Sequence, residues 1–236
     1  MFVPTVLVIL GGFLPPFIWL YFILKEDARN PEPKRIIALA LFAGMLGVPL
    51  VLPLEQYAQL HLALPLDSFQ TIIAWATVEE TVKYALAALL ILWRPEVDEP
   101  LDYAVYLMTV AIGFAALENV LFVFHPIMAG QLTEGMLASD LRFLGSSLLH
   151  VVASATIGFT LAFSYNKLPN VRMAYAALGV ILAITLHTAF NLLIISQDGS
   201  RTFEALLLVW VGAVVIFALS EIVKYRTYRN TSAFIR

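Results

Sequence analysis

The chain has no cysteine among its 236 residues. This absence excludes a disulfide framework, a thiolate nucleophile and a Cys-ligated metal. Charge is also scarce, because only 13% of the residues are charged while 61% are hydrophobic, and soluble domains carry about 25% charged residues. The composition therefore predicts an integral membrane protein.

Several protease signatures are missing as well. The sequence contains no H-E-x-x-H, the helical zinc-binding motif of zincins, and no serine paired with lysine or histidine in an evident catalytic role. Its aspartates fall in expected loops or near membrane ends, which argues against an aspartyl intramembrane protease. No internal repeat or low-complexity tract is visible, so we expect a single membrane domain over residues 1–236.

Seven apolar segments are long enough to cross a membrane, because about 20 helical residues span a hydrocarbon core about 30 Å thick. They are residues 3–24, 36–54, 69–93, 101–124, 142–165, 173–195 and 203–224. They predict an all-α, polytopic helical bundle with about seven transmembrane helices. The first is expected to be an uncleaved anchor, kinked around Pro15 and Pro16.

Loop charges predict the orientation in the cell membrane. Eleven of the 14 Lys and Arg residues fall on one side of the seven spans, Arg142 and Arg201 fall on the other, and Lys83 lies within a span. Because basic loops stay in the cytoplasm, we expect the N-terminus outside and the C-terminus in the cytoplasm.

Ionisable residues also lie well inside the apolar segments: Glu79, Glu80, Glu118, His150 and His187. A charged side chain near the centre of a membrane helix costs at least about 2.5–3.5 kcal/mol and usually marks function. Counted from the outer loops at 1.5 Å per residue, all four segments carry these residues at a depth of roughly 10–18 Å. This common depth predicts one shared, hydrated site in the outer half of the membrane.

Helical spacing adds two residues to this site. In TVEETVKY, Lys83 follows Glu79 by four residues and Glu80 by three, so its ammonium can reach either carboxylate. In HTAFN, Asn191 follows His187 by four residues and lies on the same helix face. Each of these side chains could instead be a helix-packing partner, but their agreement in depth favours a functional site.

Four of these patterns resemble motifs of one family. They are E-E-x-x-K at 79–83, F-A-x-x-E-N at 114–119, the lone His150, and H-x-x-x-N at 187–191. Together with D-x-x-x-P-E-P at 27–33, they resemble the PrsW family of intramembrane proteases over nearly the whole chain. That family is related to the type II CAAX prenyl endopeptidases. The resemblance implies a protease that cuts single-span membrane proteins, such as anti-sigma factors, from the outer side.

The resemblance also implies roles for single residues. Glu79 and Glu80 match the paired catalytic glutamates, and Lys83 takes the place of the basic residue after them. The pair in HTAFN matches the family's final motif. Glu118 stands where the prenyl endopeptidases have histidine, so we expect His150 of the next helix to supply that imidazole.

The expected chemistry is peptide hydrolysis by glutamate-activated water. Glu79 or Glu80 would be the general base, and the two histidines would position the water or donate protons. Asn191 would stabilise the oxyanion, and Lys83 would orient the glutamate pair.

A competing version of this site adds a divalent metal such as zinc. Glu80, His150 and His187 would then be three ligands, with water as the fourth. The family is commonly labelled as metalloproteases, whereas its prenyl-endopeptidase relatives are argued to work without metal. Of the two versions we favour the one without metal.

Two other functions stay open at this point. Chains of glutamate and histidine also relay protons in transporters, although no repeat or broken helix supports a proton-coupled transporter here. A non-catalytic membrane scaffold of the same fold is the other alternative. As partners we expect the lipid bilayer and a membrane-protein or peptide substrate, and no nucleic acid.

Overall fold

All secondary structure in the described residues is helical. The computed structural model describes residues 2–26, 30–65, 68–195 and 200–234. The helices are α1 (Phe2–Glu26), α2 (Lys34–His61), α3 (Phe69–Leu90), α4 (Asp102–Met128), α5 (Leu132–Leu141), α6 (Ser147–Phe163), α7 (Pro169–Ile195) and α8 (Thr202–Phe234), and a π-helical turn, η1 (Arg142–Ser146), joins α5 to α6. The predicted all-α class is confirmed.

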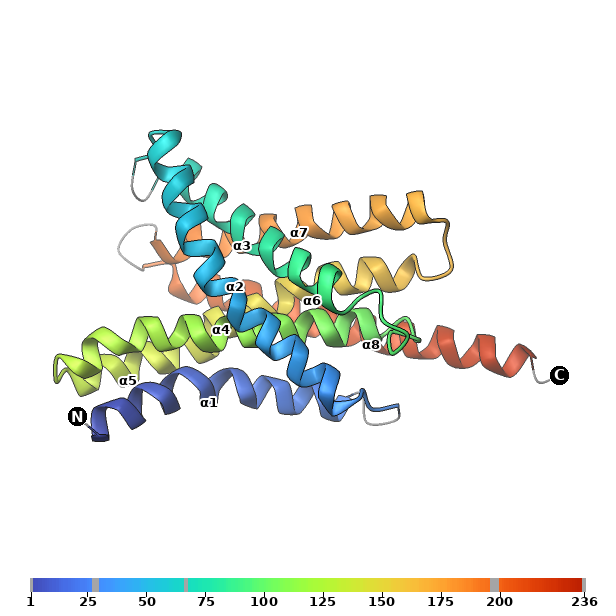
Figure 1. Ribbon diagram of the computed structural model, residues 1–236, viewed down its shortest axis with the longest axis horizontal. Helices are drawn as coiled ribbons and strands as arrows, with labels where there is room; N and C mark the ends of the chain where they lie inside the picture. The colour runs from blue at the N-terminus through green and yellow to red at the C-terminus, as the bar shows by residue number, and fades with distance from the viewer. Residues whose placement is uncertain (1, 27–29, 66–67, 196–199, 235–236) are drawn as a thin grey trace.

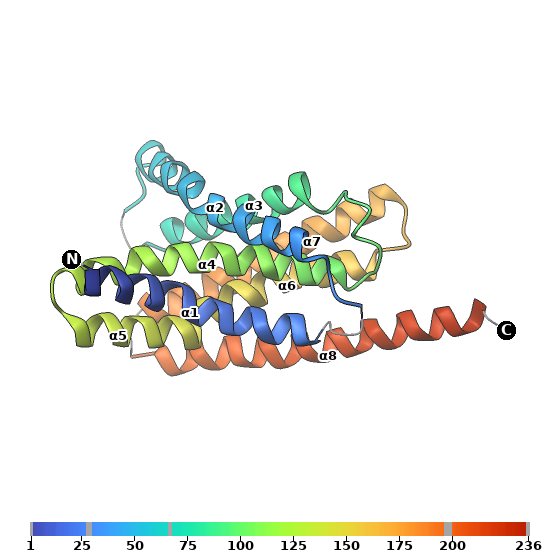
Figure 2. The same ribbon diagram turned by 60° about the horizontal axis from the view of Figure 1, so that its bottom comes forward.

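Helix α4 forms the centre of the bundle. Its residues 102–116 are all buried, as expected of a helix that is apolar on every side. Helices α1, α2 and α6 pack against it, and α7 packs against α6 and α3. In Figure 2, α2 and α3 lie on one side of α4, and α1 and α8 lie on the other.

Two glycines let α2 and α4 cross in direct contact. A Cβ on Gly44 would lie 1.9 Å from the carbonyl oxygen of Val110, and a Cβ on Gly113 would lie 2.0 Å from that of Leu41. Only glycine permits such a close backbone approach. Beyond the crossing, the C-terminal half of α2 leans away from α4, as Figure 1 shows.

In the part of the chain that the structure describes, six helical runs are long and apolar enough to cross a membrane. They are Val3–Glu26, Lys34–His61, Asp102–Met128, Leu132–Phe163, Pro169–Ile195 and Thr202–Thr227. The remaining expected segment is α3, whose 22 residues measure about 33 Å at 1.5 Å per residue. It differs from the six by carrying three charges in its middle. The prediction of a polytopic helical membrane protein is confirmed.

The prediction of an outer loop at residues 125–140, between the expected segments 101–124 and 142–165, is wrong. Helix α4 continues to Met128, and α5 begins at Leu132, so only a short turn separates them. The fifth expected span, 142–165, is the second part of a longer helical run. This run has no capped boundary at residue 142, because η1 carries the backbone from α5 directly into α6.

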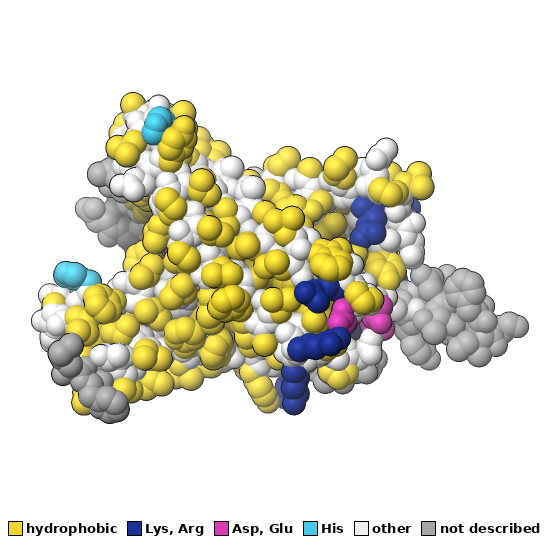
Figure 3. All heavy atoms as spheres, viewed as in Figure 1, with side chains coloured by type: hydrophobic (Ala, Val, Ile, Leu, Met, Phe, Trp, Pro, Cys, Tyr) yellow, Lys and Arg dark blue, Asp and Glu magenta, His cyan; other side chains and the backbone are white. Residues whose placement is uncertain are grey.

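The connections alternate between the two ends of the bundle. Residues 30–33, 91–101 and 164–168 lie at one end, at the right in Figure 1, while the N-terminus and the α2–α3 and α4–α5 connections lie at the other. Lys and Arg side chains on the face in Figure 3 gather at the right-hand end. The alternation matches that expected from the loop charges.

Candidate active site

Helix α3 brings the glutamate pair and Lys83 into the interior. Ser68 caps the helix by accepting a hydrogen bond from the Thr71 amide at 3.2 Å, the usual role of serine at this position. Glu79 is 9% exposed, and Glu80 and Lys83 are fully buried. Lys83 Nζ donates to Glu80 Oε1 at 2.6 Å, so the i,i+3 ion pair expected from the spacing is present.

His187 of α7 joins the same carboxylate. Its Nδ1 lies 2.7 Å from Glu80 Oε1, and the imidazole is 2% exposed. Because a carboxylate only accepts, Nδ1 carries the proton in the neutral ring, and Nε2 keeps a lone pair. Glu80 therefore holds His187 in the tautomer suited to a base or a metal ligand.

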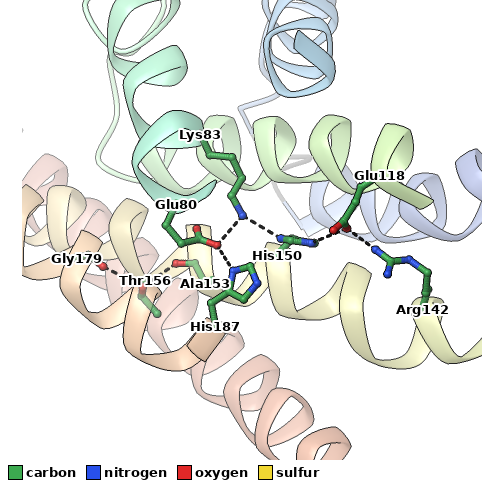
Figure 4. Close-up of polar contacts among 9 residues, drawn as sticks. All are labelled: Glu80, Lys83, Glu118, Arg142, His150, Ala153, Thr156, Gly179 and His187. Atoms are coloured by element: carbon green, nitrogen blue, oxygen red, sulfur yellow. Dashed lines mark hydrogen bonds and ion pairs between the residues drawn. The ribbon is translucent and has the colours of Figure 1, made fainter. Parts of the chain in front are cut away.

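His150 of α6 extends the chain of contacts, drawn in Figure 4. Lys83 Nζ lies 2.9 Å from its Nδ1, and Glu118 Oε2 lies 3.0 Å from its Nε2. An ammonium only donates, so Nδ1 accepts and Nε2–H donates to Glu118. The His150 and His187 rings meet edge to face, with centroids 5.2 Å apart.

Arg142 is a site residue that the sequence did not reveal. It lies in η1, forms an ion pair with Glu118, and donates to Asn119 Oδ1. Its guanidinium also covers the Phe122 ring, 3.9 Å from the ring centroid. From the sequence, Arg142 counted only as an outer loop charge. The usable signal was the need of Glu118, inside an apolar helix, for a cation, with two basic residues on that side.

A cavity of about 550 Å³ opens beside this cluster. Glu79, Glu118, His150, His187 and Asn191 all line it. The structure thus brings the seven predicted residues together. Five of them form one hydrogen-bonded network: Glu80, Lys83, Glu118, His150 and His187. Glu79 lies close to the two histidines of this network, and Asn191 lines the same cavity. Their catalytic roles stay predictions.

Three further groups on the cavity wall were not expected. Glu55 of α2 and Trp75 of α3 line it, as does Arg142. Glu55 sits in the part of α2 that was predicted to lie in an outer loop. Trp75 is one of several aromatic residues in apolar segments, so the sequence alone did not distinguish it from aromatics that face lipid.

Glu79 has no ion-pair partner among the described residues. Glu80 pairs with Lys83 and Glu118 pairs with Arg142, and the cavity wall holds a further carboxylate, Glu55. Glu79 Oε2 is buried and has no hydrogen-bond partner in the described part of the chain. A buried carboxylate in this situation needs a proton, a water or a cation.

The donor set fits a divalent metal. Ligand atoms of Glu79, His150 and His187 lie within 4.8 Å of one another. Glu79 offers its unpartnered oxygen and His187 its Nε2 lone pair, whereas His150 can bind only by giving up its contact with Lys83 or Glu118. Glu80 was expected from the sequence in this set, but the carboxylate in the group is Glu79.

A bundle of membrane helices that holds carboxylates and imidazoles around a cavity has the parts of a hydrolytic membrane enzyme. Comparison with known families agrees, since residues 32–220 match the PrsW family intramembrane metalloproteases. The chain belongs to this family.

Three curated relatives illustrate the similarity. Protease PrsW of Clostridioides difficile is 25% identical, over 94% of this chain and 93% of its own length. Protease PrsW of Geobacillus kaustophilus is 27% identical over 75% of each chain. Protease PrsW of Bacillus subtilis is 26% identical, over 79% of this chain and 82% of its own. No solved structure matches the chain.

Family membership makes this protein a hydrolase that acts on a protein substrate. It displaces the transporter and scaffold alternatives. The family's description as metalloproteases, with the buried group of Glu79, His150 and His187, favours the metal-dependent version of the site over the metal-free one preferred from the sequence.

Proposed function

We propose that this protein hydrolyses a peptide bond of a single-span membrane protein, with Glu79 as the base that activates water. One observation carries the assignment of the base to Glu79 rather than Glu80. Both glutamates have a buried Oε2 without a partner in the described residues, but Glu80 Oε1 is engaged by both Lys83 and His187, whereas Glu79 lines the cavity.

The neighbours of Glu79 have supporting roles. Glu80 orients His187 through Nδ1, and Lys83 neutralises Glu80, so His187 Nε2 can hold the attacking water or the departing amine. The proton that Glu79 takes from water then passes to the leaving nitrogen. Asn191, on the same wall of the cavity, would donate to the oxyanion.

His150 has a positioning role in this scheme. Lys83 and Glu118 hold its two ring nitrogens from opposite sides. This clamp keeps the ring beside His187 and limits its rotation. Arg142 in turn holds Glu118.

A metal would use the same residues. Glu79, His150 and His187 would hold it, and a divalent ion bound there would supply Lewis-acid polarisation of the scissile carbonyl. A carboxylate has two oxygens, so Glu79 as a ligand keeps one oxygen for the proton of water. Dialysis against a chelator is expected to abolish cleavage, and zinc should restore it in the wild type but not in His187→Ala. Unchanged activity in metal-free protein would show that cleavage does not require a metal.

We further propose that the site opens towards the outer face. The cavity lining includes Glu55, Ile195 and Thr202, which lie near the end of α2, at the end of α7 and at the start of α8. On the face shown in Figure 3, the Lys and Arg side chains gather at the opposite end of the bundle. With the positive-inside rule, this supports an outer N-terminus and a cytoplasmic C-terminus in the cell membrane. The substrate class, an anti-sigma-factor-like single-span protein, follows from the family resemblance.

The test is cleavage of a co-expressed single-span protein. Wild type should release a shortened product, whereas Glu79→Gln and His187→Ala should not. Glu134→Gln, on an exposed position of α5, is the matched control and should cleave like wild type. Persistent cleavage by Glu79→Gln, with the variant present at wild-type amounts, would refute the assignment of the base.

A further inference from the structure

Trp75 differs from the other tryptophans of the chain. The chain has four. Trp19 donates through Nε1 to Phe143 O at 3.3 Å, Trp93 to Leu89 O at 2.7 Å, and Trp210 to Leu144 O at 3.1 Å. The Nε1 of Trp75 is buried and has no acceptor among the residues that the structure describes.

The residue that carries this unpartnered donor lines the candidate active site. Trp75 lines the same cavity as Glu79, and it lies four residues earlier on α3, so the two side chains share a helix face. An indole N–H can only donate, and the rigid ring gives it one direction. The hydroxyls of Ser154 and Thr188, also buried without a partner in this part of the chain, can rotate towards their own helix instead.

A buried donor without an acceptor is unfavourable, so the acceptor is expected to come from a molecule that enters the cavity. A helix about 11 Å wide occupies roughly 500 Å³ per turn of 5.4 Å. The cavity of about 550 Å³ therefore has room for about one turn's worth of chain. Peptide that binds there in an extended form leaves main-chain carbonyl oxygens free, and these need donors in a membrane.

We propose that the Trp75 indole N–H donates a hydrogen bond to a main-chain carbonyl of the substrate, in a subsite next to the scissile bond. Four residues along α3 correspond to about 6 Å, which is close to two residues of extended peptide at about 3.3 Å each. The bound carbonyl thus belongs to a residue one or two positions from the one attacked near Glu79. This inference rests on the proposed proteolytic function.

Binding can be tested without cleavage. The Glu79→Gln variant, labelled with ¹⁵N at its tryptophan indoles, is titrated with a synthetic peptide that covers the cleaved segment of a protein cut by wild type. The Trp75 indole proton, assigned by its loss in Trp75→Phe, should move downfield, while the Trp93 signal stays in place. A Trp75 signal that does not move at saturating peptide would overturn the inference.

Kinetics on purified wild type and variants test the Trp75 subsite separately from the proposed proteolytic function. Trp75→Phe should raise KM roughly five- to tenfold with kcat within about twofold, as expected for one uniform hydrogen bond. Benzothienylalanine at position 75 keeps the ring shape without the N–H and should raise KM as Trp75→Phe does. The exposed control Trp93→Phe should match wild type.

Two results would contradict the subsite. Unchanged KM in both Trp75 variants would refute it, while the loss of cleavage in Glu79→Gln would leave the proposed function intact. A fall in kcat without a rise in KM would make Trp75 an oxyanion donor instead and would also refute the subsite as stated. If Glu79→Gln cleaves like wild type, it is the proposed function that fails.

Discussion

Lys83 is the charged residue on which the buried network depends most. Its ammonium is fully buried and contacts Glu80 Oε1 and His150 Nδ1, and it lies 4.9 Å from the centroid of the Phe114 ring. A buried ion pair adds little net stability, but its separation is costly, because the remaining charge loses its counter-ion.

Lys83→Met should therefore destabilise the fold more than a surface change does. We expect a loss of about 3–5 kcal/mol, because Glu80 is left as a buried carboxylate without its cation. Denaturation in detergent would measure it, with exposed Lys25→Met as the control. Adding Glu80→Gln should restore part of the stability but no activity. A Lys83→Met variant as stable as wild type would show that the pair is not needed.

Arg142 should matter for catalysis through Glu118 and His150. Arg142→Gln removes the cation that holds Glu118, so we expect kcat to fall by about 10–100-fold, as for other groups that orient an active-site histidine. Glu118→Gln should lower kcat similarly, and the double variant should be little worse than either, since both act through one contact. Exposed Arg201→Gln is the control. This chain of contacts would be contradicted if the double variant lost the product of the two single losses in kcat, or if Arg142→Gln kept the wild-type kcat.

The sequence predicts much of this cluster because polar residues in apolar helices are rare. Glu79, Glu118, His150 and His187 stood out by depth, and the structure brings them together around one cavity. The sequence could not predict which glutamate is engaged by Lys83 and which faces the cavity, because i,i+3 and i,i+4 pairs are equally possible on a helix. Trp75 was invisible, because its distinguishing feature is the acceptor that its N–H lacks.

At the scale of elements, the crossing of α2 and α4 opens the cavity. Gly44 and Gly113 bring the two backbones into contact, and Val48, Val51 and Phe114 pack just beyond them. Past this cluster, α2 and α4 diverge and form two walls of the site (Figure 1). The close crossing thus determines where the two helices begin to diverge.

Gly44→Ala should disturb this crossing. Its Cβ would lie 1.9 Å from a backbone oxygen, so the helices must separate, at a cost of about 1–3 kcal/mol. Gly11→Ala is the matched control, because its Cβ would meet its nearest neighbour, Ser139 Oγ, at an ordinary 3.5 Å, and we expect less than about 0.5 kcal/mol. Thermal unfolding in detergent compares the two, and equal midpoints would contradict the crossing.

Helix ends and irregular turns were less predictable than the spans. Pro126 and Gly130 are residues that favour a loop, yet α4 runs through Pro126 and α5 follows after a short turn. The π-helical turn η1 has no sequence signature in a single chain, although it places Arg142 on the cavity wall. Such turns are decided by tertiary contacts and recur at functional sites.

At the scale of the whole molecule, the orientation can be tested by cysteine labelling, because the chain has no cysteine of its own. Gln131→Cys lies in the α4–α5 connection and Asn166→Cys in the α6–α7 connection, and both positions are exposed. A membrane-impermeant maleimide should label residue 131 in intact cells and residue 166 only after permeabilisation. The reverse pattern would place the cavity mouth in the cytoplasm.

The central claim is that Glu79, whose buried Oε2 has no partner among the described residues, removes a proton from the water that attacks the peptide. The most direct measurement is the turnover number of purified protein in liposomes, with a transmembrane peptide as substrate, for wild type and Glu79→Gln. We expect kcat of Glu79→Gln to fall by about 10²- to 10⁴-fold, with thermal stability preserved. A correctly folded Glu79→Gln protein that keeps its kcat within a factor of ten would contradict it.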